Sequence, residues 1–314
     1  MSEKIQKDIL LYLKENIKNY KYLYISWFGG EPLLETEIIK YLTYEIKKIC
    51  LENNIEYHAG ITTNGTLLTK QNFELLLECN VEDFQITLDG PKYIHDKQRV
   101  TINGKGTFTK IYENLQMIKN VQGQFNIVLR TNIKAGVDDA IYDYIDRVYR
   151  DFASDKRFKL HLVAIADLTG ETKATIDLCD TAHLFPYYRY AKQKGISFEF
   201  YEKLFQPTCM VCYAANPHSF VIGSDGTVYK CTVAFNNSFN QIGKINEGKI
   251  MYDKKKMDLW IKNGIETSTK CKLCKFVPLC LGKFCPLEKI ENDIEPCPPF
   301  EKYIQKYMRL FINE

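Results

Sequence analysis

The chain has 314 residues, of which 45% are hydrophobic and 26% are charged, and its formal net charge is +3. These values are ordinary for a globular protein and exclude disordered and fibrous chains. Basic residues are scattered apart from a run at 254–256, so we expect no nucleic-acid partner. No apolar run approaches the ~20 residues that cross a bilayer, and the N-terminus lacks an apolar signal core. We therefore expect a cytoplasmic protein without a membrane partner.

The first two hundred residues alternate helical and strand patterns. A helical face with Ile5, Ile9 and Leu13 in residues 3–19 precedes a β-favouring run at 22–28. The pair recurs as helix 36–52 and strand 56–62, helix 69–79 and strand 82–88, helix 107–120 and strand 125–133, helix 138–152 and strand 157–164, and helix 177–194 and strand 196–201. Six such units predict an α/β fold of parallel strands with helical crossovers.

The order of elements also predicts two domains. Each unit of a (β/α) barrel begins with a strand that a helix then covers, so a barrel that starts at helix 3–19 would lack its first strand and expose a strand edge. From about residue 205 the rhythm gives way to short strands, turns and cysteines. We therefore expect a partial barrel over 1–204 and a small cysteine-rich domain over 205–314.

Active-site loops of parallel sheets follow the carboxyl ends of the strands. The first predicted strand runs into Gly29-Gly30-Glu31-Pro32. The two glycines would let a ligand approach the backbone, and the Glu31 carboxylate could accept hydrogen bonds from an ammonium group. A tight turn with a solvated glutamate is the alternative at this stage.

Polar residues also follow the next two predicted strands. The second ends in Thr63-Asn64-Gly65, and the third ends in Thr87-Leu88-Asp89-Gly90, with Arg99 a short distance beyond. Asn-Gly and Asp-Gly are common turn dipeptides, which is the simpler interpretation. Their joint position at successive strand ends favours a binding site for a polar ligand.

Eleven cysteines are distributed unevenly along the chain. Cys50, Cys79 and Cys179 lie in helical patterns, and we expect them in the core. The other eight follow as Cys209-x2-Cys212, Cys231, Cys271-x2-Cys274-x5-Cys280-x4-Cys285 and Cys297. Eight thiolates could complete two four-ligand sites, and their spacing alone leaves both zinc and iron–sulfur clusters open.

Taken together, these segments resemble the radical S-adenosylmethionine (SAM) superfamily, in the branch that carries a C-terminal SPASM domain. The resemblance implies a partial (β/α)6 TIM-like barrel, here without its first strand, followed by a SPASM domain. It also implies that Gly29, Gly30, Glu31 and Pro32 contact the amino group of SAM. The residues that would line the SAM or substrate pocket are Thr63, Asn64, Thr87, Asp89 and Arg99.

The SPASM cysteine pattern is matched by Cys212-x13-Gly226-x4-Cys231 and the later cysteines. The resemblance favours two auxiliary [4Fe–4S] clusters over zinc. It implies that Cys209, Cys212, Cys231 and Cys285 hold one cluster, and that Cys271, Cys274, Cys280 and Cys297 hold the other. The x4 spacing between Cys280 and Cys285 departs from the x3 of the family pattern. Clusters fully ligated by protein would transfer electrons and would not coordinate substrate.

A larger departure concerns the catalytic cluster. The family's defining CxxxCxxC motif occurs nowhere in this sequence. The missing part coincides with the first barrel strand, so we expect a fragment, an internal start or a decayed gene more than a loss of single cysteines. An intact relative would cleave SAM to a 5′-deoxyadenosyl radical that abstracts a substrate hydrogen.

The resemblance also bears on the substrate. SPASM enzymes mostly modify peptides and proteins, which implies a peptide or protein substrate and an electron donor such as flavodoxin or ferredoxin. Sulfatase-maturating relatives carry an aspartate base where this chain has Thr232, which disfavours that activity. The alternatives are a non-catalytic iron–sulfur paralogue that serves electron transfer or peptide binding, and a zinc-stapled α/β protein.

Overall fold

The computed structural model describes residues 1–136, 138–165, 179–199, 204 and 206–312. They form two compact units. The sheet unit contains residues 17–165 and 179–199, and the cysteine unit joins residues 1–16 to residues 204 and 206–311. Within the described ranges, no helix is long and apolar enough to cross a membrane.

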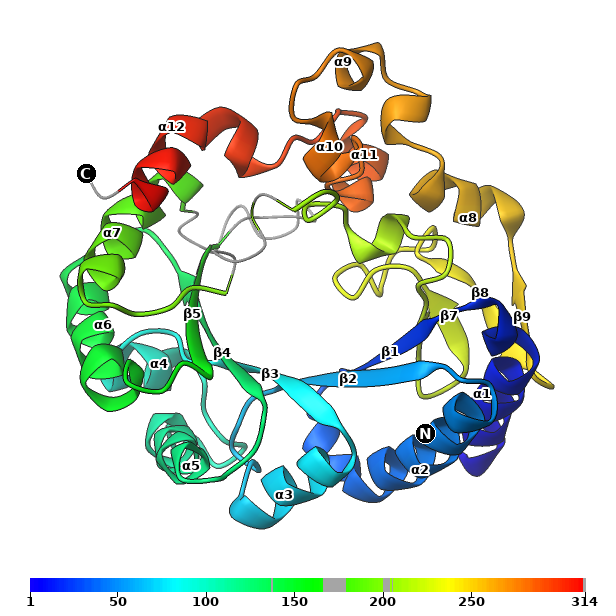
Figure 1. The fold of residues 1–314 in the computed structure, drawn as a ribbon, viewed down its shortest axis with the longest axis horizontal. Helices are drawn as coiled ribbons and strands as arrows, with labels where there is room; N and C mark the ends of the chain where they lie inside the picture. Colours follow the sequence, from blue (N-terminus) through cyan, green and yellow to red (C-terminus); the bar gives the residue numbers. More distant parts are fainter. Residues whose placement is uncertain (137, 166–178, 200–203, 205, 313–314) are drawn as a thin grey trace. The chain divides into compact units, whose positions relative to one another are not determined.

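The sheet unit is built on five parallel strands that neighbour one another in sequence order. They are β1 (Tyr22–Trp27), β2 (Glu56–Thr63), β3 (Val81–Thr87), β4 (Asn126–Ile133) and β5 (Phe158–Ala164). Right-handed crossovers between strands in this order place every connecting helix on the same face, as Figure 1 shows. The predicted α/β fold with a parallel sheet is confirmed.

The helices of this unit follow the predicted order with two differences. The unit contains α2 (Thr36–Glu52), α3 (Lys70–Glu78), α4 (Lys92–Gln98), α5 (Phe108–Lys119), α6 (Asp138–Phe152) and α7 (Phe185–Gln193), with 3-10 turns η1 (Ile17–Asn19), η2 (Pro32–Glu35) and η3 (Thr181–Leu184). The short α4 was not predicted. In the described part of the predicted strand 196–201, pairing is limited to one parallel bridge between Leu160 and Phe198. Residues 177 and 178 of the predicted helix 177–194 lie outside the described residues.

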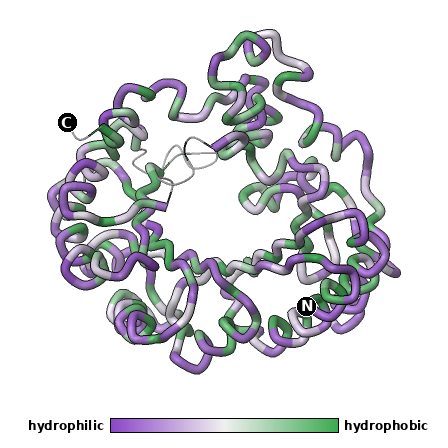
Figure 2. The backbone as a smooth tube through the Cα atoms, in the orientation of Figure 1, coloured by the Kyte–Doolittle hydropathy of each residue, from purple (hydrophilic) through white to green (hydrophobic). Residues whose placement is uncertain are grey.

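The two faces of the sheet differ in chemistry. In β4 every second residue is buried, which is the period-2 pattern of a strand with one covered face. The covered face packs against helices, for example where the Phe73 ring of α3 lies 4.8 Å from that of Phe84. The opposite face carries polar side chains of β2 to β5: His58, Thr62, Asp83, Gln85, Thr87, Asn126, Arg130, Asn132, Lys159 and His161. Figure 2 shows the corresponding mixture of polar and apolar positions along the strands and helices.

Strand β1 is an edge of the sheet and is much less buried than its neighbours. It pairs with β2, and its residues alternate between exposed and half-buried. Tyr22 and Tyr24 are 65% and 47% exposed. The hydroxyl of Tyr24 crosses β2 at Gly60, where a Cβ would lie 2.2 Å from it, and donates to Asp83 Oδ2 at 3.4 Å. The structure thus has the exposed strand edge that the sequence predicts.

The cysteine unit contains a small antiparallel sheet. Its strands β6 (Val221–Ile222), β7 (Thr227–Tyr229), β8 (Gln241–Asn246) and β9 (Lys249–Tyr252) pair in that order. The remaining elements are short: η4 (Tyr213–Ala215), α8 (Lys254–Ile261), η5 (Gly264–Glu266), α9 (Thr269–Lys272), α10 (Val277–Cys280), α11 (Pro286–Asn292) and α12 (Pro299–Phe311). Residues of the sheet, η4, α8 and α11 form a core cluster with Trp260, which is fully buried.

Helix α1 (Glu3–Asn16) belongs to this unit, which corrects the expectation that residues 3–19 form a barrel helix. Its Ile5 joins the core cluster around Val228 and Ile245. Gly226 makes room for that contact, since a Cβ there would lie 2.7 Å from Ile5 Cδ1. An apolar stripe at helical spacing shows that a helix needs a partner but not which one, so the sequence could not assign α1 to a sheet.

Candidate functional site

Glu31 links the ends of β1 and β2. Its Oε1 accepts hydrogen bonds from the Leu33 amide at 3.0 Å and from Thr63 Oγ1 at 2.7 Å, and its Oε2 accepts from the Asn64 amide at 2.8 Å. Glu31 is therefore the N-cap of the turn that begins at Pro32. Two carboxylate oxygens offer about four acceptor positions, so one is left for an ammonium donor. The structure thus brings together the residues predicted after the first two strands.

The backbone before Glu31 is open. Gly29 and Gly30 are exposed, and a Cβ at either position would meet no atom within 4 Å. Gly29 has φ +153°, a conformation that side-chain-bearing residues rarely adopt. The space in front of these two peptide units is what a ligand needs to approach the backbone. Their contact with SAM stays a prediction.

Asp89 joins the ends of β3 and β4. One carboxylate oxygen accepts from Arg99 Nε at 2.6 Å, and the other accepts from the backbone and side-chain amides of Asn132 at 3.0 and 2.9 Å. The Asp89 side chain is 4% exposed. Its amide donates to Nδ1 of the buried His95 at 3.1 Å, so His95 carries its proton on Nε2, opposite Thr107 Oγ1 at 3.0 Å. Asp89 and Arg99 thus organise this edge, and their contact with a ligand stays a prediction.

Three neighbouring strands carry polar side chains side by side on the face opposite the helices, near the same edge. Thr87, Arg130 and His161 are register partners on β3, β4 and β5. Burial lowers the pKa of Arg130, although its guanidinium stays protonated at neutral pH. Burial also lowers the pKa of His161, and Glu199 opposes that effect. Sequence reasoning predicted Thr87 alone; the alternation in residues 126–133 is the signal that could have placed Arg130 beside it.

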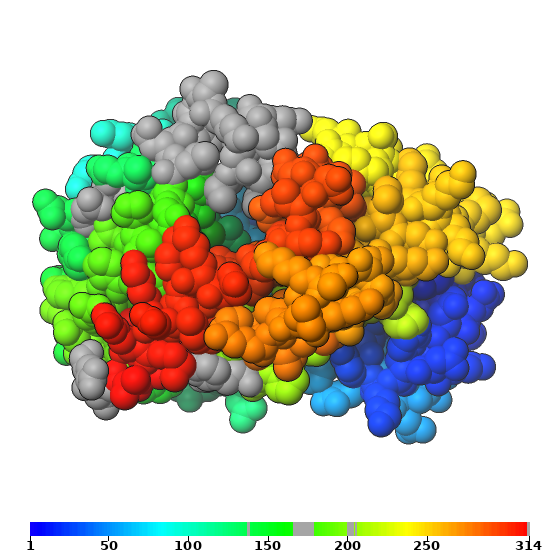
Figure 3. Space-filling model, turned by 90° about the horizontal axis from the view of Figure 1, so that it is seen from above, coloured from blue at the N-terminus to red at the C-terminus, as the bar shows by residue number. Residues whose placement is uncertain are grey.

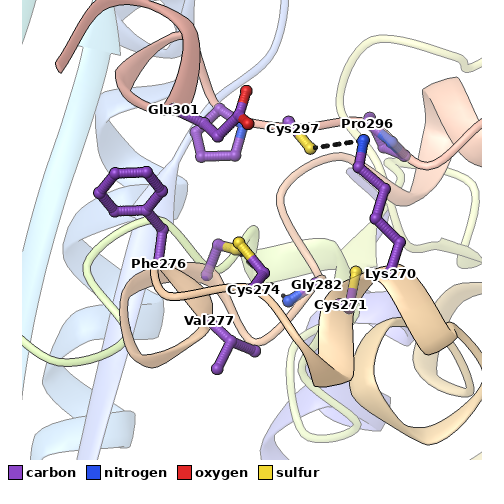
Figure 4. Close-up of a pocket in the computed structure, with 11 residues that line it drawn as sticks. Lys270, Cys271, Cys274, Phe276, Val277, Gly282, Pro296, Cys297 and Glu301 are labelled. Atoms are coloured by element: carbon purple, nitrogen blue, oxygen red, sulfur yellow. Dashed lines mark hydrogen bonds between the residues drawn. The ribbon is translucent and has the colours of Figure 1, made fainter.

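Four of the predicted ligand cysteines line one pocket in the cysteine unit. Cys271 and Cys280 are buried at its base, and Cys274 and Cys297 are half-buried. Figure 4 shows Lys270 reaching toward Cys297, where its Nζ lies 3.5 Å from the sulfur. Burial raises the pKa of Cys280, and the three neighbouring thiols raise it as well. Four thiols in one pocket match the second predicted cluster set.

The segment between Cys280 and Cys285 is one residue longer than in the family pattern. Leu281 and Gly282 both adopt left-handed conformations, with φ +52° and +69°. A Cβ at Gly282 would lie 2.8 Å from the Cys271 sulfur, and the Gly282 amide donates to the Cys280 sulfur at 3.4 Å. A glycine is required here, because any side chain would enter the pocket. A group bound by these thiolates would need the Gly282 backbone to lie this close to the sulfurs of Cys271 and Cys280.

The other four cysteines are gathered only in part. Cys231 lies in the core cluster of the unit, and Cys212 and Cys285 pack against it. Burial raises the pKa of Cys212 to about 11, and Cys285 and Cys231 add to the effect. Cys209 instead donates to the Leu204 carbonyl at 3.4 Å. The structure therefore brings three of this predicted set together, and the ligation by Cys209 stays a prediction.

Backbone pairing holds the two cysteine segments beside each other. Amides of residues 208, 210 and 212 donate to carbonyls of residues 278, 279 and 283, at 2.9 Å in each case. The Cys209-x2-Cys212 segment thus runs along the segment that carries Cys280 and Cys285. Residues more than sixty positions apart in sequence become neighbours, as the predicted ligand sets require.

Asn240 fixes the turn that carries Cys231, and sequence reasoning missed it. The side chain is fully buried, and its Oδ1 accepts from the amides of Lys230 and Cys231 at 3.0 and 2.9 Å. Its Nδ2 donates to the carbonyls of Cys231 and Ala234. Every hydrogen-bonding position of the amide serves the same turn. A lone asparagine in a loop gives no sequence signal for such a role.

Lys230 is a buried cation in the same region. Its Nζ donates to the carbonyls of Asn216 and Ser219, both at 2.6 Å. Burial lowers its pKa to about 8, and Cys212 opposes the shift. A buried lysine beside thiols is suited to a neighbouring negative charge.

The thiols outside these two groups behave as predicted. Cys50, Cys79 and Cys179 are buried in the sheet unit, which confirms their expected place in the core. Burial raises the pKa of Cys50 and of Cys79, so both are protonated at neutral pH. In the part of the chain that the structure describes, no group of three His, Cys, Asp or Glu side chains is arranged to hold a single metal ion.

Several known proteins are similar to this chain. The model of the radical SAM superfamily matches residues 2–140. A cysteine-type anaerobic sulfatase-maturating enzyme of Clostridium perfringens is 25% identical over 305 residues, covering 90% of this chain and 79% of that protein. A radical SAM cyclopropyl synthase of Paramaledivibacter caminithermalis, TigE, is 27% identical over 195 residues, covering 61% of this chain and 37% of that protein.

Solved structures share the fold. The native sulfatase-maturating enzyme anSMEcpe with bound AdoMet superposes with a TM-score of 0.69 at 20% identity, covering 99% of this chain and 87% of that one. SuiB of Streptococcus suis bound to S-adenosylmethionine gives 0.55 at 17% identity, covering 94% and 69%. Residues 2–140 thus match the radical SAM superfamily, and the chain is a homologue of the anaerobic sulfatase-maturating enzymes.

Proposed function

We propose that this chain belongs to a radical SAM enzyme that modifies a peptide or protein and that carries two auxiliary [4Fe–4S] clusters. The observation that carries the proposal is the pocket that joins Cys271, Cys274, Cys280 and Cys297. Cys212, Cys231 and Cys285, with Cys209, would hold the other cluster. These thiols fit such groups, because thiolates are the ligands of iron–sulfur clusters and seven of the eight lie in two groups.

The carboxyl edge of the sheet supports a SAM site. The open backbone at Gly29 and Gly30 and the remaining acceptor position of Glu31 suit the amino group of SAM. Thr63 and Asn64 hold the Glu31 carboxylate in place, and Asp89 and Arg99 fix the next strand end. When bound, SAM and its catalytic cluster supply a 5′-deoxyadenosyl radical that removes a hydrogen atom from the substrate.

The substrate class rests on the relatives and on one position in the cysteine unit. Structures of anSMEcpe include one with a bound Kp18Cys peptide, and SuiB has been solved with its precursor peptide SuiA. Thr232 follows Cys231 here, and its hydroxyl pairs with Tyr213 at 2.8 Å. A hydroxyl in this pairing is a poor base at neutral pH. We therefore propose a peptide or protein modification other than sulfatase maturation, with a flavodoxin- or ferredoxin-type electron donor.

The test is reductive SAM cleavage by protein purified without oxygen from its natural source. The proposal expects 5′-deoxyadenosine, detected by mass spectrometry, when a strong reductant and SAM are added. Protein that contains iron and sulfide but forms no 5′-deoxyadenosine would contradict the enzymatic role and favour a non-catalytic iron–sulfur protein. Protein with zinc in place of iron would contradict both.

A further inference from the structure

The segment around the four-cysteine pocket is strongly basic. Residues 267–287 contain Lys270, Lys272, Lys275 and Lys283 and no Asp or Glu. Lys283 is half-buried and pairs with Glu266 at 3.2 Å, whereas the first three lysines are exposed. Three exposed positive charges therefore lie in the segment that carries three of the pocket's four cysteines, and one of these charges, Lys270, lines the pocket.

An exposed apolar side chain lies among these charges. Leu273 is 84% exposed and stands in sequence between Lys272 and Cys274, directly after the single turn of α9. Figure 3 shows this segment, in orange, at the surface beside α12 in red. An exposed apolar side chain beside basic side chains is the composition of a transient protein-docking face, in which charges guide the encounter and the apolar group provides contact area.

The same segment connects the surface to the thiols. Lys270 is exposed, yet it lines the pocket, and its Nζ lies 3.5 Å from the Cys297 sulfur. Glu301 is the acidic residue that lines the pocket, and Glu295 nearby in sequence pairs with Lys289 at 2.8 Å. A protein seated on Leu273 would lie beside the segment that carries Lys270 and Cys274, which line the pocket.

We propose that Leu273, Lys270, Lys272 and Lys275 form a docking face for a small acidic electron-carrier protein of the flavodoxin type. This rests on the proposed function, because a carrier gains from docking here if the pocket holds a cluster. Charge complementarity selects the partner: a basic face favours an acidic protein and disfavours a basic one. Lys272 and Lys275 are exposed and are not among the residues that line the pocket, so their charges can serve a partner.

The experiment measures binding of an acidic flavodoxin to the cluster-loaded full chain by fluorescence titration without oxygen. The double variant Lys272→Glu/Lys275→Glu should weaken binding by about tenfold or more, and Leu273→Ser should weaken it severalfold. Binding by the unaltered chain should also weaken as salt rises. The matched control is Lys254→Glu/Lys255→Glu on α8, which makes the same charge change on the same unit and should alter the dissociation constant by less than twofold.

Iron content distinguishes failure of the docking face from failure of the proposed function. Each variant should keep the iron and sulfide of the unaltered chain, and Lys272→Gln/Lys275→Gln serves if charge reversal disturbs folding. Equal weakening by both lysine pairs, or unchanged binding with iron retained, would overturn the docking face and leave the clusters standing. Absence of iron from the unaltered chain would overturn the proposed function itself.

Discussion

The two units of this chain reach a folded state by different means. The sheet unit has a large apolar core. In it, the ring centroids of Phe73, Phe84 and Phe125 lie 4.8 to 6.4 Å apart. The cysteine unit has a small core around Trp260, and two of its helices, α9 and α10, are single turns. Small units with little apolar area usually need metals or crosslinks for stability. The comparison predicts that the sheet unit depends on apolar burial and that the cysteine unit depends on groups bound by its thiols.

The largest expected effect tests the apolar unit. Phe84 is fully buried in β3, and Phe84→Ala should reduce the free energy of unfolding by about 3–5 kcal/mol, because it leaves a cavity. Chemical denaturation monitored by circular dichroism measures this loss. Iron bound by the folded variant should not change. The control is Phe28→Ala, where the side chain is 46% exposed and the loss should be small; an equal loss in both would contradict the account of the core.

Asn240 tests the cysteine unit in the same way. Asn240→Ala removes four hydrogen bonds to the turn that carries Cys231, and we expect about 1–3 kcal/mol of destabilisation. Here iron should also fall, because the turn places Cys231, which is a predicted cluster ligand. Hydrogen exchange would locate the opening in residues 230–240 and not in β3 or β4. Asn292→Ala, at an exposed position, is the control, and retention of full iron by Asn240→Ala would contradict the coupling.

A Glu31 variant distinguishes a role in SAM binding from a role in capping the local turn. Glu31→Gln keeps an acceptor for Thr63 but removes the negative charge, so SAM should bind about tenfold more weakly, the equivalent of about 1.4 kcal/mol. Equilibrium dialysis with labelled SAM measures the change. Glu35→Gln, at an exposed position, is the control. Unchanged affinity in a folded Glu31→Gln variant would show that the carboxylate only caps its turn.

The smallest effect concerns pH. Burial lowers the pKa of His95, so the folded state holds this imidazole neutral. The unfolded chain binds the proton below its ordinary pKa of about 6.5, so stability falls as pH drops from about 6.5 toward the folded pKa. His95→Gln should flatten this part of the profile of unfolding free energy against pH. An unchanged slope would mean that other groups, such as His161, control it.

The sequence predicts the sheet unit and the cysteine unit to different extents. Helix and strand positions in the sheet unit are predictable because buried residues repeat with period 2 or 3.6, as β4 and α2 show. The partner of α1 was not predictable, because Ile5 and Ile9 would suit either sheet. The family resemblance implied which four thiols share a pocket, but the sequence did not indicate that the Cys209 thiol donates to the Leu204 carbonyl.

The roles of single polar residues were the least predictable. Glu31 and Asp89 each use their carboxylates to join two strand ends, and the sequence showed only that both follow strands. Hydrogen bonds between residues tens of positions apart depend on strand register, which no local pattern contains. Asn240 was missed because a lone asparagine in a loop gives no sequence signal for its hydrogen bonds.

The most direct test of the central claim is the iron and acid-labile sulfide content of this 314-residue chain, purified without oxygen. Two thiolate-bound [4Fe–4S] clusters predict about eight irons and eight sulfides per chain. Cys274→Ala should lower the iron by about four, whereas Cys50→Ala, in the core of the sheet unit, should leave it unchanged. Protein with almost no iron and about two zinc ions per chain would contradict the account.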